Sequence, residues 1–306
     1  MVARIFILGN LCFFIMTSFF AFNVMANSFY SNTDNIVLMS SFETKNCCAS
    51  YVMIHGCKYL VKQKKAYKKQ LAVVRDALAA YIAQDLAIAH RVYVISSKKK
   101  FPGKVHPYWP ATLHTLAPGE TVRKQRNSKY NALRIKQEWA HAQSFDEKGL
   151  TKIIINFMTW HWQLPIIIAL DLIIGNSDRH CGNLCYDPQT DSFCAIDMDD
   201  TFNKDLCIIA YKKFIMMKKA KNNFTKEEKR ALVQMKNTLK FLVNRHKPRT
   251  LINKLHFFAK KAGFVKGSTL YDESVKKKLL YYESMITQSN ASAYKLIALL
   301  DQIINK

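Results

Sequence analysis

The stretch Gly175-Asn-Ser-Asp-Arg-His-Cys-Gly-Asn183, together with Ala195-Ile-Asp-Met-Asp-Asp200, is the most informative part of this 306-residue chain. The apolar run that precedes the first stretch, residues 166–174, predicts a buried helix. Pro165 suits the first turn of that helix, and the glycine at 175 suits its end. The helix is therefore expected to lead directly into a loop of polar side chains.

The residues that follow this loop predict a hairpin. Residues 183–186 and 193–196 are short and apolar, and Asp187-Pro-Gln-Thr-Asp191 between them has the composition of a turn. If the two strands pair, Asn183 and Asp197 lie at the same end of the hairpin. A carboxamide and a carboxylate at one strand end are suitable oxygen ligands for Mg²⁺.

These side chains match the division of labour that phosphoryl transfer needs. Asp178, five residues before Asn183, can face an attacking hydroxyl. Asn183 and Asp197 can hold a metal ion on the phosphates. The spacing therefore favours a kinase-like reaction.

The pattern Asp-Arg-His-x-x-Asn, followed by a strand of two hydrophobic residues and Asp, resembles a known group of proteins. It is similar to the phosphoinositide 3- and 4-kinases and their atypical relatives, which include HipA-type toxin kinases, secretory-pathway casein-type kinases and secreted bacterial effector kinases. The similarity covers about 25 residues. It implies an atypical kinase of the protein-kinase-like superfamily that uses ATP and Mg²⁺ (or Mn²⁺). In that group Asp178 would be the catalytic Asp, Asn183 a metal ligand, and Asp197 the counterpart of the Asp in the kinase Asp-Phe-Gly motif.

The rest of the chain predicts an α+β, two-lobed fold like that of the kinases. A small strand-rich lobe with one long helix, residues 27–120, is expected to precede a mainly helical lobe, residues 121–306. In the first lobe we expect strands at 36–39, 50–54, 59–62, 91–95 and 112–116, a turn at His55-Gly56 and a helix at 66–89.

The resemblance also implies a strand lysine on the nucleotide phosphates, paired with an acid on the long helix. Lys62 has the right position, although Lys58 and Lys64 share its face by strand alternation. The helix contains no Glu, and Asp76 is preferred over Asp85 because it lies nearer the helix start.

The polar residues 40–46 are expected to form the loop that covers the phosphates. This segment has no glycine, so backbone amides and the hydroxyl of Ser41 or Thr44 are expected to bind the nucleotide. The connection between the lobes, where backbone groups hold adenine, is expected at 111–119.

Other polar residues of the motif have both a functional and a structural interpretation. Arg179 is interpreted as a structural ion-pair partner. His180 either stabilises the transferred phosphate, as in lipid kinases, or is a core histidine with satisfied hydrogen bonds. Asp199 and Asp200 either assist metal binding or cap the next turn. The cysteines near the motif lack CxxC spacing, so buried thiols are favoured over a zinc site.

The formal net charge of +24 predicts a polyanionic partner. Lysines gather at 58–69, 98–104, 212–221, 260–266 and 276–278. Each cluster is either a solvated helix face or a site for an inositol polyphosphate or an anionic membrane. No nucleic-acid-binding motif lies beside them, so nucleic acid is not expected.

The first 26 residues predict a signal peptide. Arg4 supplies a positive start, residues 5–22 are uncharged and apolar, and Val24-Met-Ala26 offers small residues for cleavage. The mature protein is expected to be exported or secreted, with delivery to a host cell as one destination. A retained membrane anchor is the competing interpretation, because the apolar run approaches spanning length.

For a kinase, a protein hydroxyl is the first choice of acceptor. Three alternatives also fit parts of the sequence, and the first is a kinase that acts on a phosphoinositide lipid. Residues 196–202 also match the nucleophile motif of haloacid-dehalogenase-type phosphatases, in which Asp197 would be the nucleophile and Asp199 the acid/base, on the first strand of a doubly wound sheet. The charge alone would fit an exported basic module that coats a membrane or nucleic acid without catalysis.

Overall fold

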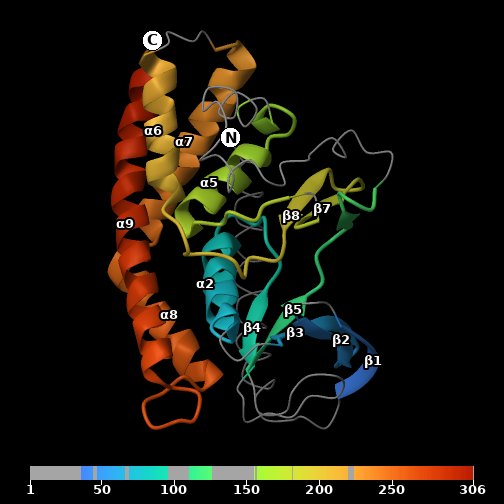
Figure 1. Ribbon diagram of the computed structural model, residues 1–306. Helices are drawn as coiled ribbons and strands as arrows, with labels where there is room; N and C mark the ends of the chain where they lie inside the picture. Colours follow the sequence, from blue (N-terminus) through green and yellow to red (C-terminus); the bar gives the residue numbers. More distant parts are fainter. Residues whose placement is uncertain are drawn as a thin grey trace, which may run out of the picture.

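The computed structural model describes residues 36–43, 47–65, 69–95, 110–125, 155, 157–180, 182–219 and 224–305. Its amino-terminal part is an antiparallel sheet with one helix, and its carboxyl-terminal part is mostly helical (Figure 1). The predicted α+β class is therefore confirmed. The predicted signal peptide, residues 1–26, lies outside the described residues. No helix in the described ranges is long and apolar enough to cross a membrane.

Five antiparallel strands form the amino-terminal sheet in the order β1-β2-β3-β5-β4. They are β1 (Ile36–Glu43), β2 (Cys47–Ile54), β3 (Cys57–Lys64), β4 (Val92–Ile95) and β5 (Ala111–Thr115). The β2–β3 turn lies at His55-Gly56, where φ is 49° and 76°, and two positive φ values suit the twist of a tight hairpin. The predicted turn is confirmed. β1 is longer than predicted, because residues 40–43 continue to pair with β2 instead of forming a loop.

Helix α2 (Ala72–Gln84) packs against β3, β4 and β5. It is shorter than the helix predicted at 66–89. Neither end has a side-chain cap, and beyond its last turn Ala87 has φ 53°, which an α-helix does not allow. Val74, Leu78 and Ile82, spaced four residues apart on one face of the helix, are fully buried.

Within the described residues, the carboxyl-terminal part combines helices α5 to α9 with a small antiparallel sheet. The elements are β6 (Glu120–Thr121), α5 (Leu164–Ile174), β7 (Leu184–Asp187), β8 (Ser192–Ala195), α6 (Leu206–Lys219), α7 (Lys226–Arg245), α8 (Pro248–Ala262) and α9 (Glu273–Ile304). The predicted buried helix and the predicted hairpin are confirmed as α5 and as β7–β8. β6 has only two residues, too few to show a periodic pattern in the sequence.

The topology contradicts the phosphatase interpretation. That motif belongs on the first strand of a doubly wound parallel sheet. Here Asp197 follows β8, which pairs antiparallel with β7, and both sheets of the described residues are antiparallel. Within the described residues, seven strands precede β8 in the chain, so β8 is not a first strand.

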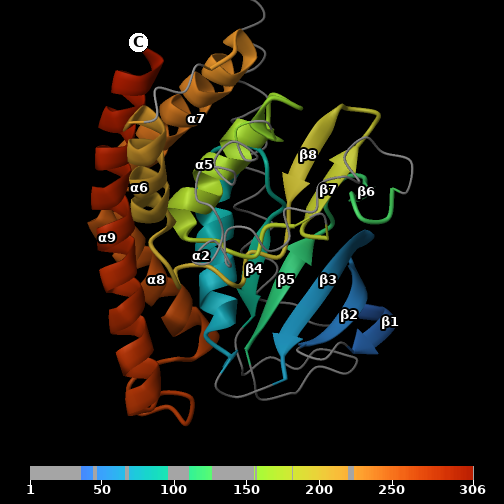
Figure 2. The same ribbon diagram turned by 45° about the horizontal axis from the view of Figure 1, so that its top comes forward.

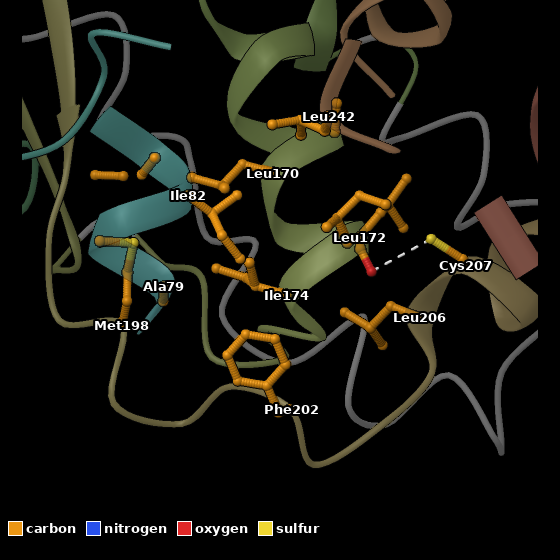
Figure 3. Close-up of a cluster of buried hydrophobic side chains, with 14 of the residues drawn as sticks. Ala79, Ile82, Leu170, Leu172, Ile174, Met198, Phe202, Leu206, Cys207 and Leu242 are labelled. Atoms are coloured by element: carbon orange, nitrogen blue, oxygen red, sulfur yellow. Dashed lines mark hydrogen bonds between the residues drawn. The ribbon is translucent and has the colours of Figure 1, made fainter. Parts of the chain in front are cut away.

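The main hydrophobic core joins the two parts of the molecule. Helices α6 to α9 lie on one side and both sheets on the other, with α2 and α5 between them (Figure 2). Ala79 and Ile82 of α2 share one buried cluster with Leu170 of α5 and Leu242 of α7 (Figure 3). Burying an Ile or Leu side chain stabilises the folded state by about 1.5–3 kcal/mol. The core therefore fixes α2 against the carboxyl-terminal helices. The far face of the five-stranded sheet has its own small cluster.

Candidate active site

Lys62 of β3 and Asp197 form the centre of the site. The Lys62 ammonium lies 2.5 Å from Asp197 Oδ1. A second pair beside it joins Lys64 to Asp199. Lys62 and Lys64 are alternate residues of β3 and so point to the same face of the sheet, as predicted.

Packing explains why Asp197 and Asp199 both face β3. Met198, between them, is fully buried, and Phe202 is 2% exposed. Figure 3 shows both side chains in the core cluster with Ile174. Because Met198 is held in the core, its two acidic neighbours point away from it. Asp197 adopts φ 54°, an unusual value for a residue other than glycine and one that is concentrated at functional sites.

The electrostatics favour a charged Lys62–Asp197 pair. Burial alone would lower the pKa of Lys62, but Asp197, Asp76 and Asp199 outweigh it and raise that pKa. Burial alone would raise the pKa of Asp197, but Lys62 outweighs it and lowers that pKa. Burial and repulsion from Asp197 raise the pKa of Asp199. The three carboxylates thus concentrate negative charge around one ammonium.

Asp76 borders the same small cavity as Lys62 but has a different partner from the one expected. Its Oδ2 lies 3.2 Å from His114 Nε2 of β5, whereas the carboxylate in contact with Lys62 is Asp197. Both Asp76 and His114 are buried. Burial would raise the pKa of Asp76, but His114 and then Lys62 outweigh it and hold the pKa below its usual range. The expected direct Lys62–Asp76 pair is therefore corrected.

Two histidines extend this network to β8. His114 Nδ1 lies 2.7 Å from His90 Nε2, and His90 Nδ1 lies 3.3 Å from the carbonyl oxygen of Ala195. Burial, reinforced by His114, lowers the pKa of His90 to about 4, so His90 is neutral near pH 7. The network ties α2 and β5 to the strand that leads into Asp197.

The loop after α5 brings Asp178 to Asn183. Asn183 Nδ2 donates to the backbone carbonyl of Asp178 at 2.9 Å and to its Oδ2 at 3.3 Å. The Asp178 side chain is 54% exposed, open to an incoming molecule. The backbone N–H of Ile196 donates to the Asn183 carbonyl at 3.1 Å, which places Asn183 and Asp197 at one end of the hairpin, as predicted.

Arg179 holds this loop and the hairpin together. Its Nε and Nη2 donate to the two carboxylate oxygens of Asp171 in α5, at 3.0 and 2.9 Å. Its Nη1 donates to the backbone carbonyls of Asn183 and Ile196, the latter at 3.0 Å. Both side chains of the ion pair are buried. Arg179 is thus the structural ion-pair partner expected from the sequence, and it is also a clamp on the residues next to Asp197.

The contacts of His180 fit both interpretations from the sequence, a core histidine with satisfied hydrogen bonds and a group that stabilises the transferred phosphate. Its Nδ1 accepts a hydrogen bond from the Gly182 N–H at 2.9 Å, and its Nε2 lies 3.9 Å from Asp178 Oδ1. The ring is therefore oriented by its own loop, with one nitrogen directed towards the Asp178 carboxylate. A role on the transferred phosphate stays a prediction.

Ser41 is not brought to the other site residues. It lies within β1, where its Oγ is 2.8 Å from Ser50 Oγ. Ser50 pairs with Val61, the neighbour of Lys62, so Ser41 lies on the face opposite Lys62. Its expected position in a phosphate loop is therefore corrected. Thr44, the alternative hydroxyl, lies outside the described residues.

The donor atoms suit Mg²⁺ bound together with phosphates. With Nδ2 of Asn183 engaged by Asp178, its Oδ1 is the atom left for a cation. The Asp197 side chain is 41% exposed, although one oxygen contacts Lys62. Within the described ranges, no group of three or more His, Cys, Asp or Glu side chains forms a ready-made metal cage. Mg²⁺ commonly uses only one or two protein carboxylates plus phosphates and water, so these two residues fit it.

Space beside the ion pairs is small. A cavity of about 10 Å³ is bounded by residues that include Lys62, Asp76 and Asp199, which is room for about one water molecule. A larger groove of about 1040 Å³ lies elsewhere, between α5, α7 and the end of α2. The size of that groove does not identify it as the reaction site, because it contains none of the residues described above.

No known family model matches this chain, and no curated protein matches its sequence. Several solved structures are similar to it. CtkA, a proinflammatory kinase of Helicobacter pylori, matches over 88% of this chain and 96% of its own, with 13% identity and a TM-score of 0.46. An ethanolamine kinase of Plasmodium vivax matches over 85% and 83%, with 11% identity and a TM-score of 0.33. The aminoglycoside phosphotransferase APH(4)-Ia matches over 93% and 99%, with 11% identity and a TM-score of 0.31.

The chain is structurally similar to members of the protein-kinase-like fold. This is a likeness of overall arrangement, and the chemistry proposed below rests on the side chains of this chain. The sequence analysis did not single out three residues at or near the site. Asp171 is a lone acid in an apolar helix, His114 alternates onto the face of Lys62, and Arg123 follows a two-residue strand. The first two patterns are readable in the sequence, whereas the third depends on tertiary pairing.

Proposed function

We propose that this protein is an ATP-dependent phosphotransferase that transfers the γ-phosphate to a hydroxyl group of a protein. The observation that carries the proposal is the convergence of Lys62 and Asp197 with Asp178 and Asn183 at one end of the β7–β8 hairpin. The four residues supply a cation for phosphate, two metal-ligating oxygens and a base near an exposed surface. Phosphoryl transfer is mainly positioning and charge stabilisation by such groups.

Each residue has a distinct role in this proposal. Lys62 binds phosphate oxygens, and Asn183 Oδ1 and Asp197 hold the metal ion. Asp178 orients the acceptor hydroxyl and receives its proton as the hydroxyl oxygen bonds to the γ-phosphorus and the bond to the leaving ADP oxygen breaks. When bound, Mg·ATP supplies the phosphoryl group and neutralises the charge of its phosphates.

The Lys62–Asp197 contact occupies the position in which these groups would act. Lys62 must shift from Asp197 towards phosphate, and Asp197 must turn an oxygen towards the metal. The 41% exposure of Asp197 leaves room for that change at its outer side. In this proposal, nucleotide binding would exchange the Lys62–Asp197 contact for contacts of Lys62 with phosphate and of Asp197 with the metal ion.

The central test is transfer of labelled phosphate from ATP to proteins of a cell extract. Asp178→Asn and Asp197→Asn are expected to reduce transfer at least 100-fold, because each removes a charge that acts on the reacting groups. Asp301→Asn, at an exposed α9 carboxylate bound to Lys236, is the matched control and should retain wild-type activity. Wild-type activity in either site variant would refute the assignment.

The acceptor class is tested in the same assay. Incorporation into protein bands supports a protein hydroxyl. Incorporation only into vesicles that contain phosphoinositide would instead support the lipid-kinase alternative. An inactive wild-type chain that also shows no thermal stabilisation by ATP and Mg²⁺ would favour a non-catalytic basic module.

The expected polyanion partner is proposed to be an anionic membrane. Support comes from α8, where Lys254 and Lys261 lie 5.2 and 5.3 Å from the ring centre of exposed Phe257. Cations beside an exposed aromatic ring suit a negatively charged lipid surface. Flotation with phosphatidylserine vesicles should fall when Phe257 and both lysines are replaced by Ala. An inositol polyphosphate that competes would identify the soluble alternative. Export through the predicted signal peptide is part of the same proposal.

A further inference from the structure

The segment after β6 is fixed to the hairpin that carries the catalytic residues. The N–H of Val122 donates to the carbonyl of Leu184 at 2.9 Å, and Gln125 Nε2 donates to the carbonyl of Tyr186 at 2.6 Å. Val122 itself is fully buried. Arg123, between these anchors, therefore has a backbone position set by β7 while its side chain is exposed.

The Arg123 guanidinium lies beside the catalytic loop. A Cβ built on Gly182 would lie 3.2 Å from Arg123 Cζ and 2.8 Å from His180 Cε1. The guanidinium and the imidazole thus flank the same point, in the loop between Asp178 and Asn183. Since His180 Nε2 is 3.9 Å from Asp178 Oδ1, Arg123 belongs to the rim on which an acceptor hydroxyl would approach Asp178.

Arg123 differs from the two other arginines near the site. Arg179 is bound to Asp171, and Arg75 donates to Asn203 Oδ1 at 2.7 Å and to the Thr201 carbonyl at 3.1 Å. Arg123 makes no ion pair or side-chain hydrogen bond with any residue in the described ranges. Arg123 is exposed, and its five N–H donors have a planar arrangement that matches a carboxylate or a phosphate.

We propose that Arg123 determines acceptor specificity by binding an acidic side chain next to the hydroxyl that is phosphorylated. This inference rests on the proposed function and adds the substrate class, a Ser or Thr in an acidic peptide segment. The exposed carboxylate of Asp178 repels such a segment, and a guanidinium at the loop between Asp178 and Asn183 reduces that repulsion. A single guanidinium suits one carboxylate, so a peptide is favoured over a head group with several phosphates.

The test compares synthetic peptides that differ only at residues flanking one Ser or Thr, with Glu, Gln or Lys in those positions. For the wild-type protein, kcat/KM is expected to be about tenfold higher for the Glu peptides than for the Gln peptides, the scale of one charge-assisted hydrogen bond. Arg123→Ala should remove the preference, Arg123→Lys should restore part of it, and Arg123→Glu should shift it towards Lys peptides. The KM for ATP should be the same in the Arg123 variants as in the wild type, whereas a purely structural defect would change the KM for ATP as well.

Arg249→Ala, at an exposed arginine of α8, is the control and should keep the preference for Glu. An unchanged Glu-to-Gln ratio in Arg123→Ala, with transfer intact, would overturn the inference and leave the proposed function standing. So would a higher KM for ATP alone, which would assign Arg123 to the nucleotide. Transfer only to phosphoinositide vesicles would overturn both the inference and the protein acceptor of the proposed function. A wild-type protein that transfers no phosphate to any acceptor would overturn both.

Discussion

Replacing Arg179 by Ala removes four hydrogen bonds at once, and the expected cost follows from what remains. The carboxylate of Asp171 stays buried with the Asn176 amide, at 3.0 Å, as its remaining side-chain donor. The carbonyls of Asn183 and Ile196 lose the Nη1 donor that they share. Breaking a buried ion pair in this way costs about 3–5 kcal/mol. Against a total stability of about 5–15 kcal/mol, that is a large fraction.

The assay is denaturant unfolding, with the midpoint and slope measured for each variant. Arg245→Ala is the matched control, because its guanidinium also contacts a carboxylate, Asp85 at 3.0 Å, but is 65% exposed. A surface pair of that kind contributes about 0–1 kcal/mol. Although both arginines contact a carboxylate, the loss in free energy of unfolding should be small for Arg245→Ala on α7 and large for Arg179→Ala beside the hairpin.

A double-mutant cycle separates the pair from its surroundings. Asp171→Ala and Arg179→Ala should each be strongly destabilising, and the double variant should cost at least 2 kcal/mol less than the sum, since each single change leaves a buried partner unpaired. Additive effects within about 0.5 kcal/mol would refute this reasoning. So would a cost below 1 kcal/mol for Arg179→Ala. Kinase activity should fall in both single variants, because Arg179 also positions the carbonyls on either side of the Asn183–Asp197 pair.

Three further predictions follow from single features. Burial lowers the pKa of His90 to about 4, so the unfolded state binds a proton before the folded state does as the pH falls. The free energy of unfolding should therefore decline between about pH 6.5 and pH 4. In denaturation curves measured at each pH, His90→Gln should reduce that decline. Gly175→Ala should destabilise by more than 1 kcal/mol, because φ is 62° and the new Cβ would lie 2.3 Å from the Lys204 carbonyl oxygen; an unchanged unfolding midpoint would contradict this. Burial raises the pKa of the Cys185 thiol to about 11, so iodoacetamide at pH 8 should label exposed Cys57 well before Cys185, as read by peptide mass spectrometry.

The sequence predicted those parts of the site that depend on local order. The β7–β8 hairpin brings Asn183 to Asp197 through a short turn, and its strands and turn residues are adjacent in the chain. The end of α5 is likewise marked by one glycine in the left-handed region. Local spacing is enough for such features, because few backbone conformations connect the elements.

Contacts between distant segments were not predictable in the same way. Lys62 and Asp197 are 135 positions apart, and nothing in either segment indicates which carboxylate the ammonium reaches. Ser41 shows the same limit, since one residue of strand register decides which face its hydroxyl occupies. Arg123 reaches the loop between Asp178 and Asn183 because β6 pairs with β7.

The resemblance to kinases implies an acid on the long helix, which contains no Glu. In the structure, Asp76 of this helix makes a different contact from the one implied. Asp76 is one methylene shorter than Glu, and its carboxylate contacts His114 on β5. His114 contacts His90, which in turn contacts the carbonyl of Ala195, two residues before Asp197. The position of α2 is thus linked to β8, the strand that leads into Asp197, through buried histidines. Lys62 is then left to contact Asp197. In the proposed reaction, Lys62 would therefore turn to phosphate without breaking the link between α2 and β8.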